Sequence, residues 1–316
     1  MPDPTAPGVQ MVWFKRDLRV QDHVPLVSAA AAGRVLPVYL VEPSLWRQPD
    51  AAAQHWGFIR ESLRMLDAAL RATGQAHARL HVVVGEAVPV LDALHRGIGL
   101  AGLHAHEETG NGHSFARDQA VRRWARVRRV PMQEVRQFGV LRGLRERDRW
   151  LASRERLMQA SCAPWPPARL AFAPFPGSAA AGSGAELESA DPQAFDAQVW
   201  HLRDGRFVPG PWPDAAALRL DPWQPPQRQR GGRVLAEATL VDFLSERAAL
   251  YRGGISSPLS APQACSRLSP HLAYGVLSLR EVVQATRARL AELSDLAAGR
   301  AAQTSQATGS WFFARV

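Results

Sequence analysis

Over its first 106 residues the chain alternates short apolar stretches with longer stretches whose apolar residues have helical spacing. Strands are expected at residues 9–14, 34–42, 78–85 and 98–106, and helices at 25–33, 54–74 and 87–97. Strands that are separated by helices pair in parallel, because a parallel neighbour needs a crossover connection. The alternation therefore predicts an α/β fold, a doubly wound, Rossmann-like parallel sheet with helices on its faces.

The rest of the chain changes character twice. Residues 160–230 are rich in proline, glycine, alanine and serine, which is typical of a long surface connector, and the tryptophans among them indicate that it is packed down. From residue 231 a helical pattern resumes, and its expected buried stripe consists of Val234, Leu235, Leu240, Leu244 and Leu250. We predict an α/β domain at 9–135, a connector at 136–230 and an all-helical domain at 231–316.

Two features bear on the compartment and on metals. The sequence has no apolar run of about eighteen residues and no signal-peptide pattern at its start, so a soluble, cytoplasmic protein without membrane contact is expected. Its two cysteines, Cys162 and Cys265, lie far apart and outside any zinc-binding spacing. We expect neither a bound metal nor a disulfide.

The formal charge of +9 is concentrated in one segment. Residues 115–156 contain thirteen arginines and five acids, and Lys15 is the only lysine of the chain. Clustered cations can follow a phosphate backbone, but a solvated helical face or an arginine-rich genome gives the same composition. Both interpretations of this segment stay open.

A charged stretch, "WFKRDLRVQDH" at residues 13–23, follows the first expected strand. Ligands of doubly wound sheets bind beyond the carboxyl ends of the strands, yet no glycine-rich phosphate motif occurs here. Asp17 is close enough in sequence to pair with Arg16 and Arg19. The stretch is either a salt-linked loop that fixes a domain contact or a direct ligand contact.

The stretch "CSRLSPHLAYGVLSLREV" at residues 265–282 reads as the start of a helix. Ser266 and Ser269 suit N-cap positions, and Pro270 suits the first turn. A helix start with two hydroxyls and the guanidinium of Arg267 could hold a phosphate. The alternative is an ordinary capped helix, and a reactive role for Cys265 is not expected because no base adjoins it.

Three separated stretches together resemble one family. These are "VWFKRDLRVQDH" near the start, "HEETGNGHSFARD" at 106–118, and "FLSERAALYRGG" followed by "SRLSPHLAYGVLSLREV". They look like the DNA photolyase and cryptochrome superfamily over about residues 9–282. The resemblance implies a photolyase-type N-terminal α/β antenna domain and a helical domain that binds FAD. By length that helical domain is incomplete here, so truncation is expected.

The resemblance also implies binding residues. Tyr251 matches a tyrosine near the flavin phosphates, and the loop that holds the FAD diphosphate is matched by Cys265, Ser266, Arg267, Leu268 and Ser269. Cys265 stands where many members have threonine, which removes one hydroxyl donor. Glu108 lies in the segment that contacts a folate-type antenna in some members. No catalytic residue can be carried over.

The function implied by the resemblance is light-driven electron transfer from FAD that repairs pyrimidine dimers in UV-damaged DNA. A cryptochrome-like blue-light photoreceptor without repair activity is one alternative. A remnant that binds neither flavin nor DNA is another, because a short helical domain would leave the flavin ring exposed and is expected to retain FAD poorly. The resemblance leaves the lesion type, the antenna and the oligomeric state open.

Overall fold

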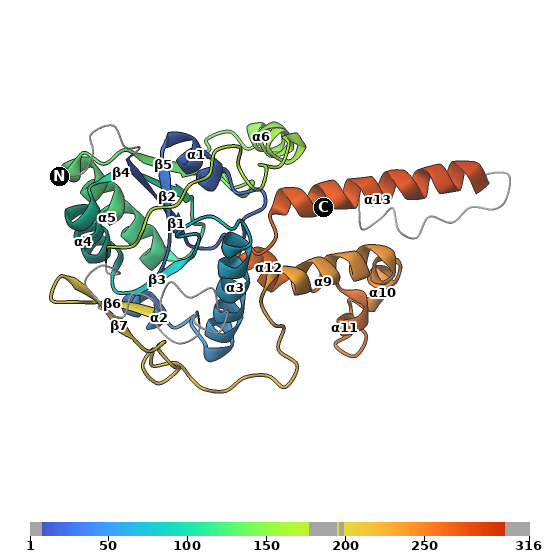
Figure 1. The fold of residues 1–316 in the computed structure, drawn as a ribbon. Helices are drawn as coiled ribbons and strands as arrows, with labels where there is room; N and C mark the ends of the chain where they lie inside the picture. The colour runs from blue at the N-terminus through green and yellow to red at the C-terminus, as the bar shows by residue number, and fades with distance from the viewer. Residues whose placement is uncertain (1–7, 177–194, 196–198, 301–316) are drawn as a thin grey trace. The chain divides into compact units, whose positions relative to one another are not determined.

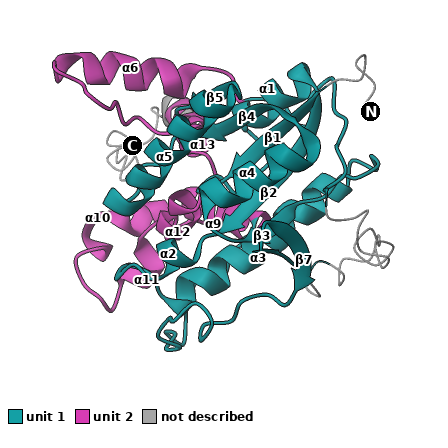
Figure 2. Ribbon diagram, turned by 90° about the vertical axis from the view of Figure 1, so that its left-hand side faces the viewer, with its two compact units in different colours: residues 1–137, 163–232 teal, residues 138–162, 233–316 magenta. Residues whose placement is uncertain are grey.

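The computed structural model describes residues 8–176, 195 and 199–300 (Figure 1). The chain divides into two compact units, residues 1–137 with 163–232 and residues 138–162 with 233–316 (Figure 2). Part of the predicted connector and the end of the predicted helical domain, residues 177–194, 196–198 and 301–316, lie outside the described residues. The division into domains at 9–135, 136–230 and 231–316 remains a prediction.

The first unit contains a seven-stranded sheet in the order β5-β4-β1-β2-β3-β6-β7. Its strands are β1 (Val9–Phe14), β2 (Arg34–Val41), β3 (His81–Val84), β4 (Leu100–His106), β5 (Met132–Val135), β6 (Val199–Arg203) and β7 (Arg206–Gly210). All neighbours pair in parallel except β6 and β7, which are antiparallel. Because the chain builds outwards from β1 in both directions, the strand order reverses between β1 and β4.

Helices link the consecutive strands from β1 to β5 (Figure 1). They are α1 (Val24–Ala32), α2 (Pro43–Trp46), α3 (Ala53–Arg71), α4 (Ala87–Ile98) and α5 (Gly112–Arg128). The strands β1 and β2 are buried along almost their whole length, as expected for strands covered on both faces. The predicted doubly wound parallel sheet is confirmed.

The connector contributes more regular structure than its composition indicates. Strand β6 extends the sheet in parallel beside β3, and β7 returns beside β6 as the antiparallel edge. Earlier in the connector, Phe172 forms a parallel bridge with Val35 of β2. These two short strands form because the edge of β3 offers unpaired backbone groups to a neighbouring strand.

The described part of the second unit is helical. It comprises α6 (Asp148–Gln159), α9 (Arg233–Ser245), the 3-10 helix η1 (Arg247–Leu250), α10 (Tyr251–Gly254), α11 (Ala261–Ala264), α12 (Ser269–Ala273) and α13 (Leu279–Arg300). Helix α13 begins with a capping box, in which Glu281 N donates to Ser278 Oγ and Ser278 N donates to the Glu281 carboxylate. No helix in the described ranges has an apolar stretch long enough to cross a bilayer.

Two details of the predicted helical pattern are wrong. In α9 the buried side chains are Ala236, Leu240 and Phe243, whereas Val234 and Leu235 of the expected stripe are exposed. Leu250 of the same stripe is exposed as well. The periodicity of apolar residues identifies a helix, but it does not decide which of two partly apolar faces is buried. In α9 the face with Phe243 is the buried one.

The stretch 265–282 also differs from one continuous helix. Helix α12 ends at Ala273, Gly275 has a positive φ of 62°, and α13 begins four residues later. The N-cap of α12 is Leu268, without a side-chain cap bond, and Ser269 is its first helical residue. The expected serine caps are therefore not formed, although Ser266 Oγ lies 3.4 Å from Leu268 N and accepts its hydrogen bond.

Candidate functional site

A cluster of buried charged side chains lies at the carboxyl ends of the central strands of the first unit. Asp17 follows β1, Glu42 follows β2 and Glu108 follows β4, and each is at most 3% exposed. Doubly wound sheets bind their ligands at this edge, next to the point where the strand order reverses. This charged edge is therefore the candidate site of the first unit.

Asp17 is the centre of one part of the cluster. Its Oδ2 lies 2.9 Å from His23 Nε2 and 2.8 Å from His106 Nδ1, and its Oδ1 accepts from Lys15 N at 2.6 Å. Burial by itself would raise the pKa of Asp17, but the attraction of His23 and the hydrogen bonds from both histidines outweigh burial and hold it well below its usual range. Burial lowers the pKa of His106 to about 3, so this histidine is neutral near pH 7.

The carboxylate and the two imidazoles are close enough together to be considered as metal ligands. His23 Nδ1, however, accepts a hydrogen bond from Leu26 N at 3.1 Å. The ring proton of neutral His23 therefore lies on Nε2, the atom that faces Asp17, and leaves that atom no lone pair for a cation. The chemistry of the donors fits a hydrogen-bonded carboxylate that joins β1, α1 and β4.

Arg117 of α5 is the centre of the other part. Its guanidinium donates to Glu42, Glu108 and Asp118, the last at 2.8 Å, and lies 4.7 Å from the Trp13 ring centroid. Burial raises the pKa of Glu42 to about 7, although Arg117 opposes the shift. One arginine thus holds carboxylates from the ends of β2 and β4, and the site carries a titratable group near neutral pH.

Glu108, the residue that resemblance connects with an antenna, is part of this network. Its Oε2 accepts from Arg117, and its Oε1 lies 3.3 Å from Arg16 Nε. Arg16 is partly exposed while Glu108 is buried. A ligand at this edge would therefore reach Arg16 before it reached Glu108, and the antenna contact remains a prediction.

Ser44, Glu86 and His113 form a further polar group beside α2. Ser44 Oγ lies 2.5 Å from Glu86 Oε2 and 3.0 Å from His113 Nε2. The serine proton is donated to the carboxylate, so His113 donates to the serine and cannot serve as its base. The Glu86 carboxylate also accepts from Ser44 N at 2.9 Å. The group ties α2 to the start of α4 and does not form a nucleophilic triad.

The stretch 13–23 proves to be a salt-linked loop within the first unit. Lys15 Nζ lies 3.3 Å from Asp118, and Arg19 donates to Gln137 Oε1 at 3.2 Å. Asp17 pairs with histidines and not with the neighbouring arginines that the sequence suggested, because His106 is brought to it by β4. These contacts account for the alternation of charge in this stretch.

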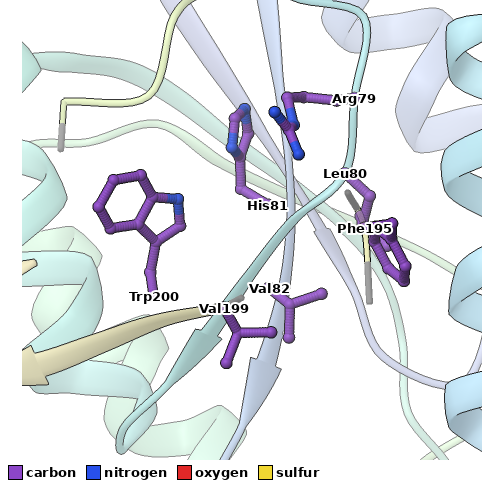
Figure 3. Close-up of a pocket in the computed structure, with 7 residues that line it drawn as sticks. All are labelled: Arg79, Leu80, His81, Val82, Phe195, Val199 and Trp200. Atoms are coloured by element: carbon purple, nitrogen blue, oxygen red, sulfur yellow. The ribbon is translucent and has the colours of Figure 1, made fainter. Parts of the chain in front are cut away.

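A small cavity lies between the amino ends of β3 and β6, and Figure 3 shows its lining. The lining residues are Arg79, Leu80, His81, Val82, Phe195, Val199 and Trp200. The His81 ring stacks on Phe175, with 4.8 Å between the centroids, and its buried Nε2 has no hydrogen-bond partner among the described residues. A buried polar atom of this kind is usually satisfied by an ordered water, so we do not assign the cavity to a cofactor.

The residues expected at the FAD phosphates all lie in the second unit. Cys265, Ser266 and Arg267 are partly exposed and Ser269 is exposed, while Leu268 is buried. Arg267 has a positive φ of 55°, so the loop turns sharply before α12. Such a turn with accessible hydroxyl and guanidinium groups fits a phosphate.

Tyr251 begins α10 and is joined to this loop indirectly. Arg247 of the preceding 3-10 helix donates through Nη1 to Cys265 O, and the Tyr251 ring lies 6.2 Å from that of Phe243. These contacts hold the two expected parts of the phosphate site in one helical cluster. The assignment of these residues to FAD remains a prediction.

The fold defines a class: a Rossmann-like α/β unit, with a charged carboxyl edge, combined with a helical unit. Residues 10–141 match the model of the family described as DNA photolyase. Together with the sequence identity to a photo-lyase that the next paragraph reports, this match shows that the chain belongs to the DNA photolyase and cryptochrome superfamily.

The chain is 31% identical over 293 residues to a deoxyribodipyrimidine photo-lyase of Agrobacterium fabrum, a match that covers 90% of this chain and 53% of the relative. It thus spans about half the length of that protein. The cryptochrome structure from Synechocystis has a TM-score of 0.67 at 16% identity and covers 99% of this chain and 60% of that one. An archaeal photolyase from Sulfolobus tokodaii, solved with two FAD molecules, has a TM-score of 0.59 at 19% identity and covers 92% of this chain and 57% of that one.

Sequence reasoning missed the residues that organise the charged edge. Glu42, His106 and Arg117 were not singled out as site residues, and they lie far from Asp17 along the chain. Their positions in the sequence could have indicated some of them, because polar residues that directly follow buried parallel strands lie together at one edge of the sheet. The sequence predicted the loop at 13–23 but not its partners.

Proposed function

We propose that this chain is a photolyase-like flavoprotein whose activity is light-driven electron transfer from FAD to pyrimidine dimers in DNA. The observation that supports this proposal best is the identity with a deoxyribodipyrimidine photo-lyase, because it extends over 90% of this chain and so includes both compact units. The relative's other half has no counterpart in this match.

For the cofactor, we propose that the turn at residues 265–269 holds the FAD diphosphate. Ser266, Ser269 and the amides of the turn would donate to phosphate oxygens, and Arg267 would neutralise their charge. Tyr251 would lie near the phosphates. When bound and reduced, FAD supplies a light-excitable electron donor. A folate-type antenna would lie at the carboxyl edge, within reach of Arg16 and Glu108.

The first test is the absorption spectrum of the purified chain, followed by identification of any released cofactor. Bands between the near ultraviolet and the blue, with FAD recovered from wild type but about tenfold less from an R267A variant, support the assignment of the turn. The exposed Arg123 of α5 provides a control, because R123A should leave the FAD content unchanged. Retention of FAD by R267A at the wild-type level would contradict the assignment.

Repair is tested separately, with a UV-irradiated oligonucleotide under blue light. Loss of dimers that depends on both light and FAD supports the enzyme. The fold shared with the Synechocystis cryptochrome makes a photoreceptor the second candidate, and FAD that is reduced by light without affinity for damaged DNA would select it. A stable, colourless protein would select the remnant that binds neither flavin nor DNA.

A further inference from the structure

Residues 140–156 of the second unit, here called the Arg–Trp segment, combine exposed apolar and cationic side chains. Its exposed large apolar residues are Val140, Leu144, Trp150 and Leu151. Its arginines are Arg142, Arg145, Arg147, Arg149, Arg154 and Arg156, against the acids Glu146, Asp148 and Glu155. Exposed apolar groups among cations indicate a binding surface more strongly than either feature by itself.

The arginines of this segment differ in their ion pairing within the described ranges. Arg145, Arg147 and Arg156 are exposed and form no ion pair with any residue in the described part of the chain. The Arg149–Glu146 pair is largely exposed on both sides and is therefore screened by solvent. Arg145, Arg147 and Arg156 thus offer positive charge that no ion pair among the described residues neutralises, which suits a polyanion.

Trp150 is held in a fixed orientation beside these cations. Its Nε1 donates to Gly139 O at 2.7 Å, and the Arg154 guanidinium carbon lies 5.9 Å from its ring centroid. The side chain is nevertheless 40% exposed. An aromatic ring that is already oriented loses little entropy when a planar group stacks on it, so Trp150 suits a nucleobase.

Helix α6, which carries half of the segment, is anchored by its other side. Met158 is fully buried, and Gln284 of α13 donates to Met158 O at 3.0 Å. Glu155 of α6 also pairs with Arg287 of α13 at 2.7 Å. Insertion into a lipid surface needs a continuous apolar face. The face of α6 with Met158 is packed, and the exposed Trp150 and Leu151 stand among charged side chains on the outer side of the helix. These contacts favour a nucleic acid over a membrane.

We propose that the Arg–Trp segment binds single-stranded nucleic acid. Its arginines contact phosphates, and a base stacks on Trp150. This binding needs neither flavin nor light and does not rest on the proposed repair activity. The Arg–Trp segment would thus be an interaction surface for single-stranded nucleic acid, formed by other residues than the turn at residues 265–269.

The test uses the full chain in the dark, with a fluorescently labelled oligothymidylate titrated by anisotropy over a range of salt concentrations. The triple variant R145Q/R147Q/R156Q should reduce the magnitude of the slope of log K against log salt by about 2, because each phosphate contact on a single strand contributes about 0.7. W150A should weaken binding by about five- to a hundredfold with little change in the slope, because it removes stacking and not charge.

The matched control is R123Q/R126Q/R129Q, which removes the same charge from exposed arginines at the end of α5 in the first unit. It should retain wild-type binding, and circular dichroism checks that all variants are folded. An equal loss of binding in the control would overturn the proposal by showing a general charge effect. Unchanged binding by W150A, or binding to phosphatidylserine vesicles but not to the oligonucleotide, would also overturn it. Since no flavin takes part, these results are independent of the repair assay.

Discussion

His23 Nε2 lies 2.9 Å from the Oδ2 of Asp17, and both side chains are completely buried. The histidine orients itself by accepting from Leu26 N in the first turn of α1. The same aspartate oxygen accepts from His106 at the end of β4. One carboxylate thereby joins the loop after β1 to the start of α1 and to the end of β4, next to the point where the strand order reverses.

The first prediction concerns this carboxylate. The D17N substitution should lower the free energy of unfolding at pH 7 by about 3 kcal/mol, because an amide cannot accept all of the hydrogen bonds that converge on Asp17. The pKa of Asp17 is lowered in the folded state, so its contribution is present above the unfolded pKa and is lost as the pH falls through the folded one. Urea denaturation at pH 7 and below pH 4 measures this loss.

Asp204 gives the control for that measurement. It is exposed in the turn between β6 and β7 and has a positive φ of 49°, a conformation that asparagine tolerates well. The D204N substitution should therefore change the stability by less than about 0.5 kcal/mol. Equal effects of D17N and D204N would refute a special role for the buried carboxylate.

The second prediction concerns Arg117. The R117M substitution leaves Glu42, Glu108 and Asp118 buried without their shared cation and should cost about 3–5 kcal/mol of unfolding free energy. R123M, on the exposed side of the same helix, should be nearly neutral. Thermal or urea unfolding of both variants makes the comparison, and a nearly neutral R117M would show that the carboxylates become protonated at little cost.

The third prediction is a pH dependence from Glu42. Its pKa is raised to about 7 when folded, so its contribution to stability is present below the unfolded pKa near 4.5 and is lost as the pH rises through 7. The E42Q variant does not titrate there. Its stability relative to wild type should therefore rise between pH 4.5 and pH 7, by about 3 kcal/mol at most. Urea denaturation at several pH values measures this difference in stability between E42Q and wild type. A difference that stays constant from pH 4.5 to pH 7 would contradict the raised pKa.

The fourth prediction concerns the turn at residues 265–269 and depends on the proposed FAD site. Cys265 is partly exposed, and a threonine hydroxyl there would add a hydrogen bond of about 1 kcal/mol to a phosphate. C265T should therefore bind FAD about fivefold more tightly in a fluorescence titration in the dark. The control is C162T, since Cys162 is the other cysteine of the chain and contacts Gln284 of α13. Weaker FAD binding by C265T than by C162T would argue against a phosphate at this position.

The sequence left two interpretations of the charged stretch after the first strand open, a salt-linked loop and a ligand contact, and it did not indicate the partners of Asp17. Asp17 has arginines as sequence neighbours, yet its partners are His23 and His106. His106 lies 89 positions away. Such a pair cannot be found from spacing along one chain, because it depends on which strand the sheet places beside β1.

The alternation of apolar strands and amphipathic helices was sufficient to determine the doubly wound sheet, since buried parallel strands and covering helices leave a periodic signal in the residues themselves. The family followed from motifs that are local in sequence. Only the tertiary structure decided that β6 and β7 extend the sheet, that α9 buries Phe243 and exposes Val234, and that Glu42 has a raised pKa. Each of these depends on burial by distant neighbours, and burial is a property of the packed chain that no short stretch of sequence contains.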